Sequence, residues 1–273
     1  MININRPTGD TKLRGQRKLT SLMAPLAWSV IALFAANLVQ AGDDPGFKTK
    51  DVILVHGAWA DGSSWSKVIP LLERRGLHVS AVQLPLTSVA EDVATVNRAI
   101  ELDSGPLLLV GHSYAGVVIT EAGNDPKVNG LVYISAYAPN AGQSVFSLNA
   151  MAPKTPVNQE IMLNAGFLSL SIEGIRADFA QDLPEAEKLT LAVTQGPVAA
   201  VAFGTPATAP AWYTKPSWYM VASEDRVISP QLEAMMAQAI NAETTTVHSS
   251  HVIMLSRPEA VADFIARAAH GRE

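Results

Sequence analysis

The chain has 273 residues, of which 48% are hydrophobic and 16% charged, a composition typical of one sizeable globular α/β domain. It contains no cysteine, which excludes disulfides and thiolate metal sites. The formal net charge of -5 gives no indication of nucleic-acid binding. The six histidines show no metal-binding spacing such as H-E-x-x-H, so we expect neither a metal nor a cofactor.

The N-terminus combines a basic leader with an apolar stretch. Positive residues between Arg6 and Lys18 precede an apolar run over residues 22–39, and small residues follow around Ala41. This order is typical of a secretory signal peptide, so we predict that residues 1–41 are cleaved off and that the protein is exported. The alternative is an uncleaved membrane anchor, because the run is nearly long enough to span a bilayer.

After a polar linker at residues 42–50, strand patterns alternate with helical patterns. Helical spacing of apolar residues separates successive apolar strands. This alternation predicts a mostly parallel sheet of about six strands with helices on both faces. We assign this α/β core to residues 51–139 and 211–273. Strands are predicted over residues 51–56, 77–82, 107–110, 128–135, 217–222 and 244–247.

The alternation stops between residues 140 and 210. Proline and glycine interrupt this segment repeatedly, and only helical fragments are predicted in it. We interpret the segment as a helical cap inserted over the sheet, with apolar side chains that mostly form the core of the cap itself. The predicted helical fragments lie around residues 159–163, 175–179 and 184–194.

Residues 107–119 contain the motif on which the functional prediction rests. An apolar strand runs into Gly111-His112-Ser113-Tyr114-Ala115-Gly116, and an apolar helix follows. A G-x-S-x-G pattern between a strand and a helix is typical of a nucleophile elbow. The two glycines lack a β-carbon, so the strand and the helix can approach closely and leave the serine hydroxyl exposed. We therefore predict that Ser113 is a catalytic nucleophile.

A serine nucleophile needs a histidine base and a carboxylate that orients the histidine. After a nucleophile elbow the acid precedes the histidine in the chain. Asp225 follows the strand at residues 217–222 and is the predicted acid, whereas Glu224 is expected to be a solvated loop charge. His251 lies in the loop before the last helix and is the predicted base, whereas His248 still lies on the strand end.

Acyl transfer also requires hydrogen-bond donors for the developing oxyanion. The backbone N–H of Tyr114, directly after the nucleophile, is one predicted donor. The second is the N–H of Ala58 in the loop after the first strand. Trp59 and Tyr137 are expected to line a substrate pocket. Two further histidines on strand ends are expected to be hydrogen-bonded structural residues rather than a second base: His56 and His112.

Together these motifs resemble the α/β-hydrolase superfamily, in particular the branch of plant methyl esterases, hydroxynitrile lyases and many bacterial esterases. The resemblance covers nearly all of the chain from residue 51 onward except the cap. It implies an α/β-hydrolase fold, with the catalytic and oxyanion residues at the positions predicted above. The branch usually has leucine, methionine or glutamine where this chain has Tyr114. The matching segments are His56-Gly57-Ala58-Trp59 with Trp65, residues 111–116, Asp225-Arg226-Val227-Ile228-Ser229-Pro230, and Ser250-His251 through Ser256-Arg257-Pro258.

The resemblance implies a serine carboxylesterase that hydrolyses small, fairly apolar esters through an acyl-enzyme intermediate. Lactone hydrolysis uses the same triad and remains an alternative. Hydroxynitrile lyases of this branch carry a lysine directly after the catalytic histidine, where this chain has Val252, and this departure favours hydrolysis. A non-catalytic ligand-binding homologue is a further alternative. The expected partner is a small-molecule ester, with no nucleic acid and no stable membrane span after signal cleavage.

Overall fold

A computed structural model describes residues 46–271 of the protein. The predicted signal peptide and its cleavage site lie outside these residues, so export stays a prediction. Among residues 46–271, no helix combines the length and apolar character that a membrane crossing requires.

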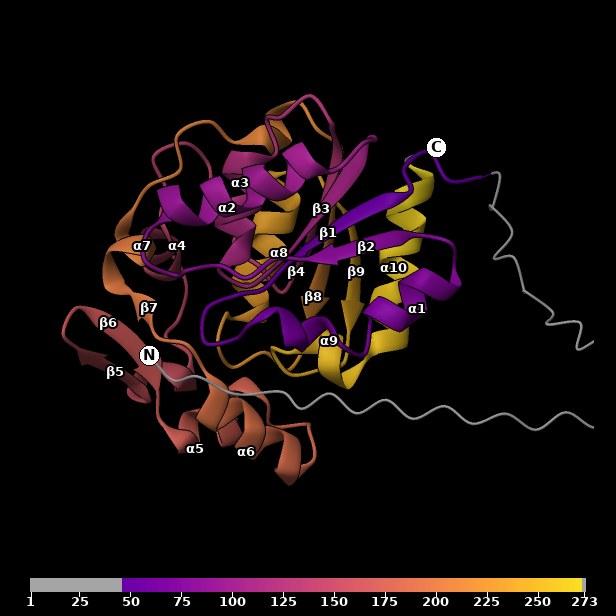
Figure 1. The fold of residues 1–273 in the computed structure, drawn as a ribbon. Helices are drawn as coiled ribbons and strands as arrows, with labels where there is room; N and C mark the ends of the chain where they lie inside the picture. Colours follow the sequence, from indigo (N-terminus) through magenta and orange to yellow (C-terminus); the bar gives the residue numbers. More distant parts are fainter. Residues whose placement is uncertain (1–45, 272–273) are drawn as a thin grey trace, which may run out of the picture. The chain divides into compact units, whose positions relative to one another are not determined.

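Six parallel strands form the central sheet, in the order β2-β1-β3-β4-β8-β9 (Figure 1). The inner strands β3 and β8 are buried along their whole length, whereas the edge strands β2 and β9 are partly exposed. Inner strands covered on both faces need continuous apolar runs, which explains why they were readily predicted. The strands are β1 (Asp51–Val55), β2 (His78–Ala81), β3 (Leu107–His112), β4 (Val128–Ile134), β8 (Ser217–Ala222) and β9 (Glu243–Val247).

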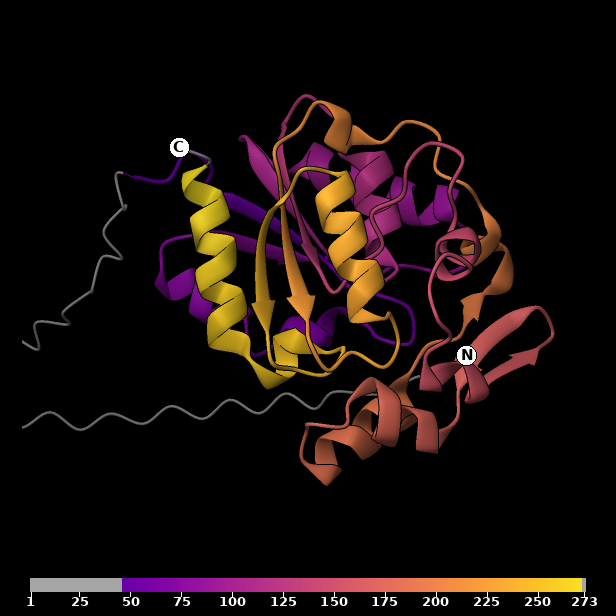
Figure 2. The same cartoon turned by 180° about the vertical axis from the view of Figure 1, so that it is seen from behind.

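Helices cover both faces of this sheet. α1 contacts α10, and α2 contacts α3. Figure 2 shows α8 and α10 on opposite sides of β8 and β9. Serine side chains cap two of the helices, since Ser88 precedes α2 and Ser229 precedes α8. The helices are α1 (Ile69–Arg74), α2 (Val89–Leu102), α3 (Ala115–Ala122), α8 (Pro230–Ala239), α9 (Ile253–Ser256) and α10 (Pro258–His270).

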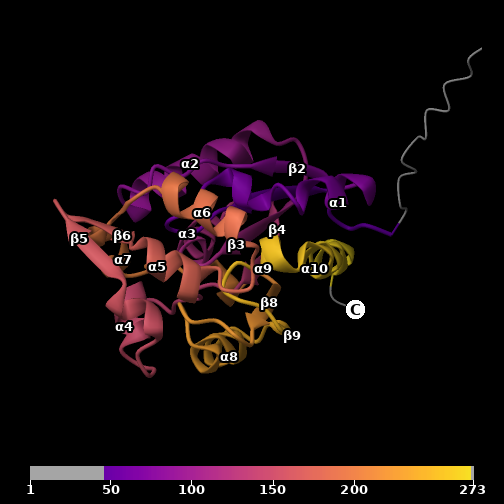
Figure 3. The same cartoon turned by 90° about the horizontal axis from the view of Figure 1, so that it is seen from below.

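The residues between β4 and β8 form the cap. It lies at the end of the sheet toward which the arrowheads of β8 and β9 point (Figure 2), and Figure 3 views the molecule from this end. Hydrogen bonds join it to the loop after β8, for example from the Thr155 hydroxyl to the Val227 carbonyl at 3.0 Å. Its elements are α4 (Val145–Asn149), β5 (Ile161–Asn164), β6 (Phe167–Leu170), α5 (Ile172–Gly174), a π-helical segment (Ile175–Phe179), α6 (Glu185–Thr194), β7 (Val198–Ala199) and α7 (Ala200–Gly204).

The predicted helical fragment around residues 159–163 is wrong, because most of it is a strand. Strands β5, β6 and β7 form a small antiparallel sheet, and residues 161–164 are a strand rather than a helix. Ala165 and Gly166, with φ of 49° and 85°, connect β5 and β6 in a two-residue hairpin. An alanine is an unusual residue for a positive φ, so the sequence lacked the usual hairpin signal. Helix is confirmed near residues 175–179 and 184–194.

Gly116 tests the close packing of α3 under the nucleophile elbow. A β-carbon at this position would overlap the Tyr137 carbonyl oxygen, which is backbone and cannot rotate away. We expect Gly116→Ala to lower the free energy of unfolding by about 3 kcal/mol, measured by urea denaturation. The matched control is Gly204→Ala in α7, where the added carbon makes ordinary contact with Phe146. Equal stability of both variants would contradict this account of the elbow.

Candidate active site

The site lies where the strand order reverses. From β1 the chain moves to β2 on one side and then crosses to β3 on the other. In parallel sheets, ligands bind at the carboxyl ends of the two strands that flank such a point. The loop after β1 and the turn after β3 meet there, because a β-carbon on Gly57 would lie only 2.7 Å from Cβ of Ser113.

Ser113 adopts the strained backbone that the elbow predicts. Its φ is 55°, in the left-handed region that a non-glycine residue adopts only when its surroundings impose it. Two backbone hydrogen bonds fix the turn: Ser113 N–H donates to the Ile134 carbonyl at 3.3 Å, and Tyr137 N–H donates to the Ser113 carbonyl at 3.1 Å. The residue is only 4% exposed, so the expectation of an exposed hydroxyl is wrong: Ser113 lines a cavity beneath the cap instead of standing on the open surface.

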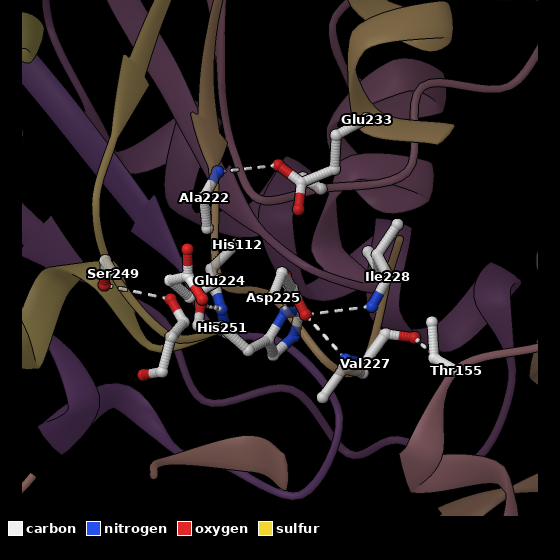
Figure 4. Close-up of polar contacts among 12 residues, drawn as sticks. His112, Thr155, Ala222, Glu224, Asp225, Val227, Ile228, Glu233, Ser249 and His251 are labelled. Carbon is white, nitrogen blue, oxygen red and sulfur yellow. Dashed lines mark hydrogen bonds and ion pairs between the residues drawn. The ribbon is translucent and has the colours of Figure 1, made fainter. Parts of the chain in front are cut away.

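The predicted acid and base are hydrogen-bonded to each other. His251 Nδ1 lies 2.5 Å from Asp225 Oδ2, and both side chains are fully buried (Figure 4). The other oxygen of Asp225 accepts the backbone N–H groups of Val227 at 2.6 Å and Ile228 at 3.0 Å. Three N–H donors therefore hold this carboxylate in place and offset its burial.

The second ring nitrogen of His251, Nε2, is available to accept a proton. Among the described residues, Nε2 has no hydrogen-bond partner, while Nδ1 is directed at Asp225. The imidazole lies between two other rings, with centroid distances of 4.6 Å to His112 and 5.2 Å to Phe179 of the cap. An imidazole oriented through Nδ1 and open at Nε2 has the arrangement of a general base.

His56 and His112 are both buried and hydrogen-bonded to backbone groups. His112 Nε2–H donates to the His251 carbonyl at 2.9 Å and so holds the backbone of His251. His56 bridges two loops, with Nδ1 at 2.8 Å from the Gly57 carbonyl and Nε2 at 2.9 Å from the Leu84 N–H. Burial lowers the pKa of both histidines, that of His112 well below its usual value, so both are neutral at pH 7.

The predicted oxyanion donors flank the serine. Tyr114 begins the helical turn after Ser113, and Ala58 lies one residue beyond Gly57, which contacts Ser113. In the part of the chain that the structure describes, neither backbone N–H donates to a backbone acceptor. Trp59 follows with φ of 59°, and its indole N–H donates to the Leu168 carbonyl in β6 at 3.0 Å, which ties this loop to the cap.

A cavity of about 150 Å³ opens onto Ser113. Its walls are mostly aromatic and aliphatic side chains, several of them from the cap. Trp59 and Tyr137 both line it. The Tyr137 hydroxyl donates to Asn149 Oδ1 at 2.9 Å, which sets a polar corner in an otherwise apolar wall. The remaining lining residues are Phe146, Val157, Asn158, Ile161, Leu168, Phe203 and Val227.

Sequence reasoning missed two buried carboxyl groups near the site, Asp92 on α2 and Glu233 on α8. The Tyr114 hydroxyl donates to Asp92 Oδ2 at 2.7 Å, and Leu86 N–H donates to Oδ1 at 2.8 Å. Burial raises the pKa of Asp92. Asp92 lies on the buried, otherwise apolar face of α2. A charged residue at such a position is the sequence feature that could have indicated a buried carboxyl group. The Tyr114 ring stacks on Phe203 at 5.6 Å, so it supports a wall of the cavity from behind.

Comparison with known proteins identifies the family. A family model described as the alpha/beta hydrolase family matches residues 52–264, and the chain belongs to this family. The predicted fold, family and hydrolase class are thereby confirmed.

Individual relatives are similar over most of the chain. A pyrethroid hydrolase of Sphingobium wenxiniae is 30% identical over 248 residues, covering 79% of this chain and 86% of that protein. The alpha/beta hydrolase nvfD of Aspergillus novofumigatus is 27% identical over 246 residues, which cover 80% of this chain and 96% of that protein. A crystal structure of the pyrethroid hydrolase PytH superposes with a TM-score of 0.72 at 25% identity, covering 82% and 98%.

Tyr114→Phe tests the buried contact beneath the elbow. It leaves one oxygen of Asp92 without its hydroxyl donor, so we expect a loss of about 1–3 kcal/mol in the free energy of unfolding. Tyr213→Phe is the matched control, since Tyr213 is 59% exposed and its change should cost less than about 0.5 kcal/mol. Urea denaturation of both variants measures the difference. A loss no larger for Tyr114→Phe than for the control would contradict this assignment.

Proposed function

We propose that the protein is a serine carboxylesterase that hydrolyses small, fairly apolar carboxylic esters, with Ser113, Asp225 and His251 as its triad. The observation that carries this proposal is the buried His251–Asp225 pair, whose Nδ1···Oδ2 distance is 2.5 Å. It occurs with a strained serine on a nucleophile elbow and an imidazole nitrogen that has no partner among the described residues.

The proposed reaction has two steps. Ser113 Oγ attacks the ester carbonyl while His251 Nε2 takes its proton, and the Asp225 carboxylate stabilises the imidazolium that forms. The N–H groups of Ala58 and Tyr114 bind the oxyanion. Collapse expels the alcohol, which receives the proton from His251. Water activated by the same imidazole then attacks the acyl-enzyme, the carboxylic acid is released and Ser113 regains its proton.

The cavity supports an apolar substrate of limited size. Aromatic walls contributed by Trp59, Phe146 and Phe203 favour alkyl or aryl groups, and about 150 Å³ suits a short acyl or alcohol portion. The names of the relatives also support ester hydrolysis, since they include a pyrethroid hydrolase, a carbendazim hydrolyzing esterase and methylesterases.

A lactonase is the alternative on the same triad, because a lactone is a cyclic ester. Cyanohydrin cleavage is disfavoured because the residue after the base is Val252, which is 1% exposed and carries no charge to stabilise cyanide. A non-catalytic ligand-binding homologue is disfavoured because all three triad residues are present. Esters and lactones of graded chain length, assayed side by side, separate the first two possibilities.

Ser113→Ala tests the proposal. With p-nitrophenyl acetate we expect the wild-type protein to show a burst of p-nitrophenol, and the variant to lose roughly 10⁴-fold or more of kcat. Ser66→Ala, at an exposed serine, is the control and should retain full activity. Ester hydrolysis that survives in Ser113→Ala would remove Ser113 from its role. A wild-type protein that hydrolyses no ester or lactone, but gains thermal stability with a small ligand, would favour the binding homologue.

A further inference from the structure

Glu233 is a buried carboxyl group that the proposed reaction does not use. It lies on α8 and is 0% exposed. Its Oε2 accepts the backbone N–H of Ala222, the last residue of β8, at 3.0 Å (Figure 4). Its Oε1 is buried and receives no hydrogen bond from any described residue, and none of the ion pairs found in residues 46–271 includes Glu233. Burying an ionised carboxylate that has one hydrogen-bond donor and no cation costs free energy. The ionised form of Glu233 is therefore not expected at this position.

Three titratable groups lie near enough to Glu233 to interact with it electrostatically: Asp225 after β8, Tyr219 on β8 and Tyr137 after β4. Of the three, Asp225 is also a hydrogen-bond neighbour of the Glu233 side chain. The Tyr219 hydroxyl donates to the Ala136 carbonyl. The Tyr137 hydroxyl donates to Asn149. Each tyrosine has one hydroxyl hydrogen, and both hydrogens are used elsewhere. Of these three groups, Asp225 is therefore the one with which the second oxygen of Glu233 can pair.

Two carboxyl groups side by side in a buried site cannot both be ionised. Asp225 already accepts three N–H donors, whereas Glu233 accepts one. The negative charge is thus better stabilised on Asp225, and the shared proton belongs on Glu233. Burial, followed by the charge and hydrogen bonding of Asp225, raises the pKa of Glu233 well above its usual value. A proton on Oε1 would turn its unpaired oxygen into a donor.

We propose that Glu233 is a positioning residue which, as a neutral carboxylic acid, donates its O–H to the Asp225 carboxylate and thereby holds the acid that orients His251. This inference rests on the proposed function of Asp225 and His251. It gives Asp225 a fourth hydrogen-bond donor and keeps one negative charge rather than two near the imidazole. Glu233 interrupts the buried stripe of α8 in the way that Asp92 interrupts that of α2.

Two substitutions of similar size separate this role from a merely structural one. Glu233→Gln keeps an oxygen for the Ala222 N–H and supplies an amide N–H toward Asp225. Glu233→Met fills the same space with neither group. The steady-state constants kcat and KM for p-nitrophenyl acetate are measured across pH, together with the low-field proton NMR resonance of His251 Nδ1–H.

For Glu233→Gln we expect kcat within about twofold of wild type, an unchanged acidic limb of the kcat/KM profile and an unchanged resonance. For Glu233→Met we expect kcat to fall about tenfold to a hundredfold with KM nearly constant, because the base is misplaced, and the resonance to shift or broaden. Rescue by glutamine but not by methionine supports the proposal.

Two results would overturn it. If Glu233 were ionised, glutamine would remove a negative charge near His251 and the acidic limb would move to lower pH. Wild-type kcat and an unchanged resonance in Glu233→Met would show that Asp225 needs no fourth donor. If the methionine variant does not fold, the acidic limb of Glu233→Gln still decides. The NMR resonance requires no ester, so this inference can be judged even if Ser113→Ala shows that the proposed esterase function is wrong.

Discussion

The site depends on one buried charge and the hydrogen bonds that stabilise it. The Asp225 carboxylate is removed from water, and such a group is tolerated in a protein interior only when donors surround it. Two backbone N–H groups of its own loop and Nδ1 of His251 supply these donors. The same bonds select the orientation of the imidazole and leave Nε2 open. The hydrogen bonds that stabilise the buried Asp225 carboxylate therefore also orient the His251 imidazole as the proposed base requires.

The rest of the fold keeps this arrangement dry and in place. Phe179 of the cap packs on the His251 ring, and the Asp182 carboxylate of the cap accepts the backbone N–H of Ser250 at 2.9 Å. From the sheet side, His112 donates to the His251 carbonyl. Water exclusion strengthens each of these polar interactions, because the local dielectric constant is low. The cap thus does more than enclose the cavity, since it also fixes the loop that carries His251.

The central strands and the turn around Ser113 could be predicted from the sequence, because each depends on residues that are close together in the chain. Buried parallel strands need continuous apolar runs, and the elbow needs Gly111 and Gly116 around Ser113, so both are visible without a structure. The order of serine, acid and histidine then located Asp225 and His251 at strand ends. The structure brings His251 and Asp225 into contact and places Ser113, Trp59 and Tyr137 on one cavity.

The remaining features depend on contacts between distant segments. The hairpin at Ala165 and Gly166 uses a positive φ at alanine, which the cap tolerates but no short sequence pattern signals. Asp92 and Glu233 are charged residue types on amphipathic helices, where exposure is the ordinary expectation. Their burial follows from partners far along the chain: Tyr114 is 22 residues from Asp92, and Ala222 is 11 residues from Glu233.

The central claim is that Ser113, His251 and Asp225 act as one unit. It is tested most directly by the rate at which a fluorophosphonate modifies Ser113, followed by mass spectrometry, in His251→Ala, Asp225→Asn and the double variant. Residues that act through a single imidazole give non-additive losses. The account predicts that the double variant reacts no more slowly than His251→Ala alone. Losses that multiply in the double variant, or modification of a different serine, would contradict it.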